Sequence, residues 1–256
     1  MADHTLLRVQ QLVKRFGALA ATDDASFEVR AGEVHALIGP NGAGKTTLIH
    51  QISGALAPDS GHILFDGQDL TRLSMAQRVR AGLVRSYQIT SIFRRFSVRD
   101  NLLLALLARR PGRPSWWRAA LRDEAAHAEA EALLARIGLA GQADRVAGGL
   151  AHGEQRQLEV GLALAARPRL LLLDEPMAGM GPDESERMVT LLHSLKAEGL
   201  TLLLVEHDME AVFRLADRIS TLVFGRVIAS DTPQAIREHP EVKRAYLGDE
   251  ELEGAL

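Results

Sequence analysis

The chain has 256 residues, of which 46% are hydrophobic and 25% charged, which indicates a globular protein with one large domain or one domain plus a subdomain. Its net charge of −3 does not indicate a general affinity for nucleic acid. Because the chain has no cysteine, disulfides and thiolate metal sites are excluded.

The N-terminal residues lack the basic and apolar regions of a signal peptide, and no apolar run of the chain reaches the ~18 residues that span a bilayer. We therefore expect a soluble protein whose membrane role, if it has one, depends on a partner.

Residues 6–13 and 25–29 predict two strands of an N-terminal antiparallel layer. Phe16 lies between them, either as a ring that stacks on an adenine base or as a core side chain at the end of a strand.

Residues 39–46 match the phosphate-binding pattern G-x-x-x-x-G-K-[ST] in full. The glycines let backbone N–H groups approach phosphate oxygens. Lys45 places a positive charge on the β- and γ-phosphates, and Thr46 offers a hydroxyl to Mg²⁺. A buried strand at residues 34–38 and a helix at residues 46–53 flank the loop, and the helix N-terminus also favours an anion.

The next elements are short. Residues 62–70 alternate around an Asp-Gly turn and predict a hairpin. Capping-box spacing at Ser74 begins a helix, and residues 83–87 predict a strand that ends at Gln88.

Residues from about 90 to 150 predict helices only, and we interpret them as a helical subdomain inserted in an α/β chain. Ser97 caps one helix, prolines and glycine at residues 111–114 break it, and a long helix follows at residues 115–137. The basic stretch around Trp116 and Trp117 either touches a membrane surface or partner, or is a solvated loop whose tryptophans cap a helix packing.

Strands and helices alternate in the rest of the chain. Several of the predicted strands consist almost entirely of apolar residues, which indicates a parallel sheet with both faces covered. The predicted strands lie at residues 170–173 and 201–205 and around Gly225, and the predicted helices lie at residues 153–166, 182–196 and 209–216 and after Thr232.

Polar side chains follow the buried strands, at the edge of a parallel sheet where ligands bind. Asp174 follows four leucines, where a magnesium-orienting carboxylate is expected, and Glu175 comes next, where it can accept a proton from an attacking water. His207 ends another buried strand and can donate to a γ-phosphate. Gln88, at a further strand end, can reach Mg²⁺ or the water through its carbonyl oxygen.

Together these motifs resemble those of the nucleotide-binding subunit of an ATP-binding-cassette (ABC) transporter, over residues 16 to about 247. Residues 39–47 resemble the Walker A loop, Gln88 the Q-loop, residues 170–175 the Walker B strand with its catalytic glutamate, and His207 the switch histidine. Residues 150–155, Leu-Ala-His-Gly-Glu-Gln, lie at the place of the family signature Leu-Ser-Gly-Gly-Gln.

The resemblance implies a P-loop NTPase of the ABC cassette type, with a parallel-sheet core, an N-terminal antiparallel β layer and an inserted helical subdomain. The whole chain would be one ABC ATPase domain, with its core at residues 1–89 and 151–232, the helical subdomain at 90–150 and a C-terminal helical tail at 233–256.

The resemblance also implies a site for ATP and Mg²⁺. The catalytic residues would be Lys45, Glu175 and His207, and the magnesium ligands Thr46, Gln88 and Asp174. ATP would contact Phe16, Gly39, Pro40, Asn41, Gly42, Ala43, Gly44, Lys45, Thr46 and Thr47. The signature residues Ala151, His152, Gly153 and Glu154 would face the ATP of the opposite subunit in a head-to-tail homodimer or heterodimer.

Such a subunit would lie on the cytoplasmic face of the cell membrane. Its direct partners would be transmembrane permease subunits, which engage the surface near residues 89–96, and a second ABC ATPase subunit. An extracytoplasmic solute-binding protein would act indirectly, and no nucleic acid partner is implied.

The chain departs from the family pattern at two places. Ala151 replaces the signature serine and His152 a glycine, while Gly181 stands where the family has an aspartate. A serine–phosphate bond is charge-assisted and worth roughly 1.5–3 kcal/mol, although the helix N-terminus at Gly153 still favours phosphate. His152 is either a donor to phosphate or a surface residue.

Within the family, the short motifs are most similar to those of branched-chain amino-acid importers, whose relatives handle urea and short amides; the lipopolysaccharide exporter ATPase is similar too. We therefore expect an ATPase that powers an importer. The alternatives are a soluble ABC ATPase that is not coupled to transport and a regulatory subunit that binds ATP with weak hydrolysis, which Ala151 and Gly181 support and Glu175 and His207 oppose. A nucleoside-type kinase would need neither the signature nor His207.

Overall fold

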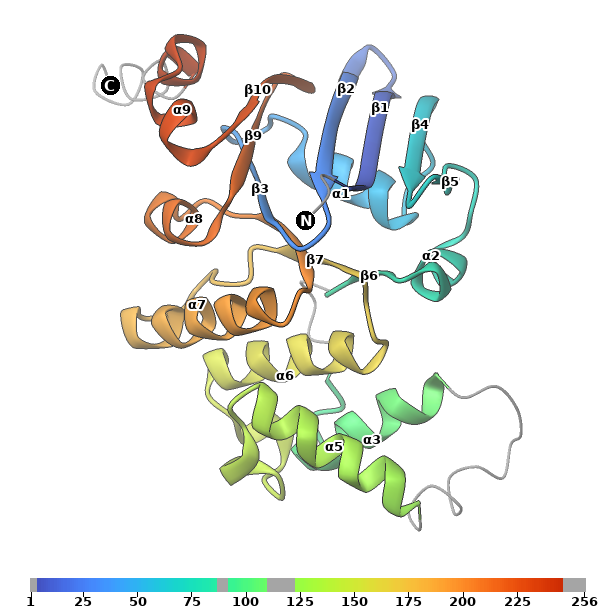
Figure 1. Cartoon of the computed structure of the whole chain (residues 1–256), viewed down its shortest axis with the longest axis vertical. Helices are drawn as coiled ribbons and strands as arrows, with labels where there is room; N and C mark the ends of the chain where they lie inside the picture. Colours follow the sequence, from blue (N-terminus) through green and yellow to red (C-terminus); the bar gives the residue numbers. More distant parts are fainter. Residues whose placement is uncertain (1–3, 87–91, 110–122, 246–256) are drawn as a thin grey trace.

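A computed structural model describes residues 4–86, 92–109 and 123–245. Gln88, Trp116, Trp117 and the tail beyond residue 245 lie outside the described residues, so the predictions made for them are not tested. Within the described ranges, no helix combines the length and the apolar character needed to cross a membrane. In Figure 1 the strands lie in the upper part of the molecule with several helices beside them, whereas the described segments of the lower part are helical.

The N-terminal strands form an antiparallel sheet, as predicted, with the order β2-β1-β4-β5. The two long strands extend well beyond their predicted apolar cores, because bulges in the β1–β2 pairing let polar residues continue the ladder as far as Phe16 and Leu19. The strands are β1 (Thr5–Phe16), β2 (Leu19–Arg30), β4 (Ser60–Phe65) and β5 (Gln68–Asp69).

A second sheet, with the order β10-β9-β3-β8-β7-β6, forms the centre of the fold. It is parallel from β9 to β6, and β10 joins it antiparallel at one edge. Every residue of β3, β7 and β8 is buried, which confirms the parallel sheet predicted from their apolar runs. The strands are β3 (Val34–Ile38), β6 (Leu83–Arg85), β7 (Leu170–Asp174), β8 (Thr201–Val205), β9 (Arg218–Val223) and β10 (Arg226–Asp231).

Helices lie between these strands in chain order, as predicted. Ser74 and Gln77 form the capping box of α2, with the Gln77 Oε1 atom accepting from the Ser74 backbone N–H at 2.9 Å. The helices that flank the sheets are α1 (Lys45–Ser53), α2 (Met75–Ala81), α6 (His152–Ala165), α7 (Pro182–Ala197), α8 (Met209–Leu215) and α9 (Pro233–Glu238).

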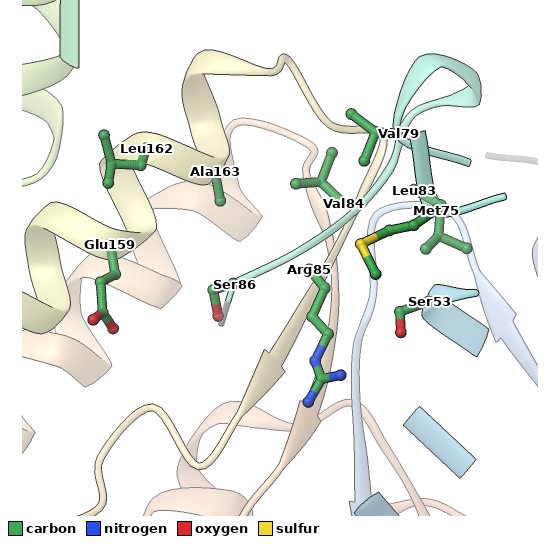
Figure 2. A pocket seen from close by; sticks show the side chains of 10 residues that line it. All are labelled: Ser53, Met75, Val79, Leu83, Val84, Arg85, Ser86, Glu159, Leu162 and Ala163. Carbon is green, nitrogen blue, oxygen red and sulfur yellow. The ribbon is translucent and has the colours of Figure 1, made fainter. Parts of the chain in front are cut away.

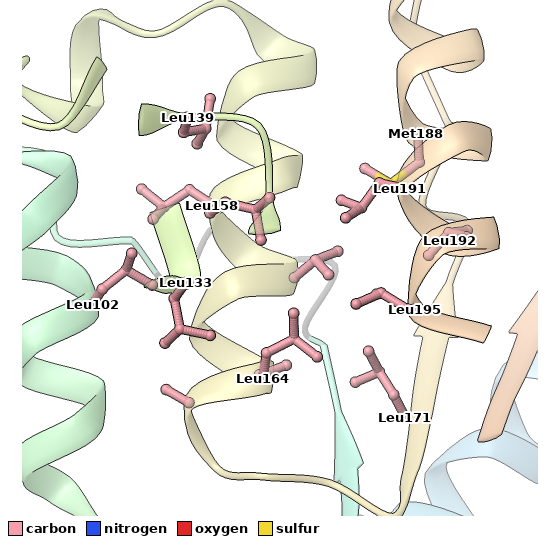
Figure 3. Close-up of a cluster of buried hydrophobic side chains, with 14 of the residues drawn as sticks. Leu102, Leu133, Leu139, Leu158, Leu164, Leu171, Met188, Leu191, Leu192 and Leu195 are labelled. Carbon is pink, nitrogen blue, oxygen red and sulfur yellow. The ribbon is translucent and has the colours of Figure 1, made fainter. Parts of the chain in front are cut away.

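The alternation of side chains along β7 shows how both faces of the central sheet are buried. Leu171 and Leu173 point into a cluster with the helices α6 and α7, and Figure 3 shows Leu171 close to Leu164 of α6 and Leu195 of α7. Leu170 points to the opposite face, with Leu172, and joins α1 and the antiparallel sheet. Burying one leucine side chain contributes about 1.5–3 kcal/mol, so the strand is held from both sides.

The lower part of the molecule contains α3 (Val98–Ala108) and α5 (Glu124–Arg136), which pack with α6 (Figure 1). The prediction of one continuous helix from residue 115 to 137 is wrong, because Asp123 is a cap rather than a helical residue. Its side chain accepts from the Ala126 N–H at 3.0 Å, and the helix begins at Glu124. The predicted division into a core, a helical subdomain and a tail stays a prediction.

Candidate active site

The phosphate-binding loop joins β3 to α1, and neighbouring strands leave no room for a side chain at two of its glycines. Gly44 has φ +101°, and a Cβ atom there would collide with the carbonyl oxygen of Ala21 in β2. A Cβ atom at Gly39 would collide with the carbonyl oxygen of Leu222 in β9. The sequence suggests glycine here because phosphate must approach the backbone. The lack of room beside β2 and β9 is a second reason, and it becomes visible only in the fold.

Lys45, the first residue of α1, folds back over the loop. Its Nζ atom donates to the carbonyl oxygens of Gly39 at 2.6 Å and of Pro40 at 2.9 Å. Burial lowers the pKa of Lys45, and the carboxylates of Glu175 and Asp174 act in the opposite direction. A phosphate placed in the loop would offer this ammonium group stronger, charged acceptors.

Asp174 ends β7 and is buried beside a cation that the sequence does not single out. The Nη2 atom of Arg85, at the end of β6, donates to the Asp174 Oδ2 atom at 2.8 Å. The two side chains are 7% and 2% exposed. Figure 2 shows the side chain of Arg85 extending from the segment that also carries Val84 and Ser86. A charged residue inside a short buried strand was the signal available in the sequence.

Mg²⁺ usually keeps several waters and is held by one or two carboxylates together with phosphates. Asp174 and the exposed hydroxyl-bearing Thr46 fit that requirement, since they flank the phosphate loop from β7 and α1. The described residues contain no cluster of three or more acidic or histidine side chains that could hold a metal ion alone. The donor set therefore suits an ion that arrives with the nucleotide.

Glu175 and His207, at the ends of neighbouring strands, contact each other. The His207 Nε2 atom lies 2.8 Å from the Glu175 Oε1 atom, and the side chains are 46% and 26% exposed respectively. Pairing of Asp174 with Val205 brings the two strand ends together. Glu175 has φ +48°, a left-handed conformation that residues other than glycine rarely adopt.

Glu206, which sequence reasoning missed, directly precedes His207 in the segment after β8 and is only 4% exposed. Its carboxylate accepts from the backbone N–H groups of Met177 at 2.8 Å and of His207 at 3.0 Å. Burial raises the pKa of Glu206, and these backbone hydrogen bonds act in the opposite direction.

The signature residues lie at the N-terminus of α6, in a different part of the molecule from α1 (Figure 1). Ala151 is the cap residue, and the Glu154 Oε2 atom accepts from its N–H at 2.9 Å. Glu184, in the first turn of α7, accepts from the Gly153 N–H at 3.0 Å. That bond is the main cause of the lowered pKa of Glu184, followed by the bond from the Gly181 N–H.

The sequence left two possible roles open for Phe16 and two for His152, and the structure bears on both residues. Phe16 is 53% exposed, with the Lys14 Nζ atom 5.8 Å from its ring centre, which excludes a core side chain at this position. His152 is exposed and begins α6 one residue earlier than predicted, close to Gly179. The stacking of Phe16 on adenine and the role of His152 stay predictions.

Comparisons with known proteins show to which family the chain belongs. Residues 22–178 match the ABC transporter family model, and residues 226–251 match the model of the branched-chain amino acid ATP-binding cassette transporter. The chain is 40% identical to the high-affinity branched-chain amino acid transport ATP-binding protein LivG of Escherichia coli, covering 95% of this chain and 98% of that one. It is 37% identical to the lipopolysaccharide export system ATP-binding protein LptB of Acidithiobacillus ferridurans, covering 96% and 98%.

Among solved structures, the ADP conformation of an ATP-binding cassette of an ABC transporter superposes with a TM-score of 0.84. That chain is 31% identical, and the match covers 95% of this chain and 99% of that one. The family match and the shared cassette fold lead to the same conclusion. The chain belongs to the ABC transporter family, as the ATP-binding, ATP-hydrolysing subunit of a transporter.

Proposed function

We propose that this subunit powers a membrane importer for branched-chain amino acids or related small amides. The observation that carries the proposal is the 40% identity to LivG along 95% of the chain. The match of residues 226–251 to the branched-chain transporter model supports it, because this segment lies outside the part matched by the general ABC model.

The geometry supports a role for each residue at the phosphate loop. Lys45 exchanges its two loop carbonyls for β- and γ-phosphate oxygens. Asp174 and Thr46 would hold Mg²⁺, which would neutralise charge on the phosphate oxygens. Phe16 presents an exposed ring for the adenine base. The carbonyl of Gln88 is proposed as a further magnesium ligand.

The Glu175–His207 pair supports the chemical step. Glu175 is partly exposed at the sheet edge, where its carboxylate can orient a water and accept its proton. The His207 Nε2 atom keeps that carboxylate in place through the 2.8 Å contact, and the same N–H can donate to the γ-phosphate once it leaves Glu175. The attack is in line with the bond to the leaving ADP.

The signature residues would complete the site of a second subunit in a head-to-tail dimer. In this proposal Ala151, His152, Gly153 and Glu154 present the N-terminus of α6 to the nucleotide held by the opposite phosphate loop. Ala151 and His152 are exposed at this N-terminus, and the helix dipole attracts phosphate there. To bind it, the Gly153 N–H would exchange the Glu184 carboxylate for a phosphate oxygen.

The helical part offers a surface for permease subunits. Phe93 and Phe96 are 52% and 38% exposed, and their rings meet edge to face with centres 5.8 Å apart. Exposed aromatic side chains of this kind favour a protein contact. We place the subunit on the cytoplasmic face of the cell membrane, with a second ATPase subunit beside it and an extracytoplasmic solute-binding protein as an indirect partner.

The test is to isolate the chain with its membrane partners from detergent-solubilised native membranes and to reconstitute the complex in vesicles. We expect ATP-dependent uptake of radiolabelled leucine, isoleucine or valine, or of urea or a short amide, in the presence of the co-purified binding protein. A complex that carries Glu175→Gln is the control for uptake driven by hydrolysis. Release of lipopolysaccharide without uptake would favour an exporter, which the 37% identity to LptB makes the second candidate.

A further inference from the structure

Glu206 is a buried carboxylate that the proposed chemistry does not use directly. It follows β8 and is 4% exposed, and each of its two carboxylate oxygens accepts a hydrogen bond. The Oε1 atom accepts from the Met177 N–H at 2.8 Å, and the Oε2 atom accepts from the His207 N–H at 3.0 Å. An ionised carboxylate suits this place because it offers two acceptors and no donor.

The two N–H groups belong to the two loops that carry Glu175 and His207. Met177 lies two residues after Glu175, and the Glu175 N–H itself donates to the Val205 carbonyl at 2.8 Å. On the other side, the ring of His207 contacts Glu175 at 2.8 Å. Glu206 therefore closes a ring of contacts that includes the backbone and side chains of both residues.

The backbone of Glu175 needs such a restraint. Its φ of +48° is strained for a residue with a side chain, and strain of this kind persists only where the surroundings hold it. The hydrogen bond from Met177 to Glu206 holds the chain on the far side of Pro176, and the bond to Val205 holds the near side. If the bond to Glu206 is lost, the segment can relax and the Glu175 carboxylate moves.

We propose that Glu206 is a positioning residue for ATP hydrolysis: it ties the backbone beside Glu175 to the backbone of His207 and thereby sets how the two side chains face each other. The inference rests on the proposed roles of Glu175 and His207. It adds a third residue to that pair, one that would act through Glu175 and His207 rather than on the nucleotide itself.

The variant Glu206→Gln keeps the size of the side chain but replaces one acceptor oxygen by an NH₂ donor. That donor must face one of the two N–H groups, so one hydrogen bond is lost. We expect kcat to fall by about tenfold to 100-fold, since misplacements of about 1 Å can cost that much, while the Kd for ATP stays unchanged. The ¹⁵N NMR signals of the His207 imidazole should move toward those in Glu175→Gln.

Glu210→Gln is the matched control, because Glu210 is an exposed glutamate four residues further on, in α8. It should leave kcat, Kd and the imidazole signals unchanged. Unchanged kcat and unchanged imidazole signals in folded Glu206→Gln would overturn the proposal and leave Glu206 with a structural role only. If Glu175→Gln kept its turnover, the role of Glu175 would fail instead, and the imidazole signals would still report on Glu206.

Hydrogen exchange of the wild-type protein covers the case in which Glu206→Gln does not fold. The Met177 and His207 amides should exchange slowly, although each lies in a loop, because both donate to a buried carboxylate. Fast exchange of either amide would contradict the proposal.

Discussion

At the scale of single residues, the candidate site combines side chains that lie far apart in the sequence. Glu175 and His207 are 32 residues apart and touch because β7 and β8 are neighbours in register. The same register places Asp174 beside Val205 at the mouth of the sheet. The ends of adjacent parallel strands meet at one edge of the sheet, so the strand order explains why these side chains come together.

Replacing Glu175 tests the proposed base. Glu175→Gln should leave ATP affinity intact and reduce phosphate release by about 100-fold or more, because a positioned general base contributes that much. The measurements are nucleotide binding and steady-state phosphate release on the assembled transporter. Glu238→Gln, an exposed glutamate on α9, is the control. Turnover near the wild-type rate would show that Glu175 is not the base.

Replacing Lys45 tests the phosphate loop. Lys45→Ala removes a buried ammonium group that is poised on two loop carbonyls. Hydrogen bonds to charged groups are worth roughly 1.5–3 kcal/mol, so ATP affinity should fall by about tenfold or more, as measured by titration calorimetry. Lys243→Ala, at an exposed position, should bind ATP normally. An unchanged affinity in Lys45→Ala would contradict the phosphate-loop assignment.

The sequence predicts the residues whose role follows from a motif or from a strand end. Asp174, Glu175 and His207 were found in this way. Arg85 and Glu206 were not, because their partners are remote in the chain: the Arg85 guanidinium bonds Asp174, and the Glu206 carboxylate bonds Met177. The role of a buried charged side chain can be inferred only when the fold shows which groups it contacts.

At the scale of elements, apolar runs predicted the central sheet because its strands are buried on both faces. The limits of other elements were harder to predict. β1 and β2 continue through polar residues by means of bulges, and the Asp123 cap begins α5 inside a pattern that the sequence alone would make one longer helix. Both depend on local hydrogen bonds that apolar periodicity does not report.

The phosphate loop is wedged between β2 and β9, and this can be tested with a pair of glycine variants. A Cβ atom at Gly44 would meet the Ala21 carbonyl, whereas nothing lies within 4 Å of one at Gly42. Both glycines have positive φ, of +101° and +77°. Gly44→Ala should therefore lower the free energy of unfolding by about 1–3 kcal/mol more than Gly42→Ala does, the usual cost of overpacking.

Denaturant unfolding at equilibrium measures this difference between the two variants. Since Gly42→Ala carries the strain of positive φ without the collision, it isolates the contact with β2. Equal stabilities would show that the loop can move away from the strand.

At the scale of the whole molecule, the N-terminus of α6 is the place where two subunits would meet. Ala151 has φ −62° and ψ 161°, nearly the conformation of Ser97, whose hydroxyl caps α3 by accepting from the Asp100 N–H. A serine at position 151 would therefore already have cap geometry. It would also restore the donor that the family signature places near phosphate.

These two effects can be separated with Ala151→Ser. The cap should raise the free energy of unfolding of the nucleotide-free subunit by about 0.5–2 kcal/mol. If the signature faces the opposite nucleotide, the ATP-bound dimer should also tighten by about tenfold or more, because a charge-assisted bond is worth roughly 1.5–3 kcal/mol. Sedimentation with ATP in the Glu175→Gln background measures the dimer, since ATP is not consumed there.

Ala197→Ser is the matched control, because it adds a hydroxyl at the exposed last residue of α7, away from any helix N-terminus. It should change neither quantity. A more stable subunit with an unchanged dimer would mean that position 151 only caps α6, and the head-to-tail arrangement would lose its support. A tighter dimer would place position 151 beside the partner's nucleotide and would explain how its natural alanine weakens closure.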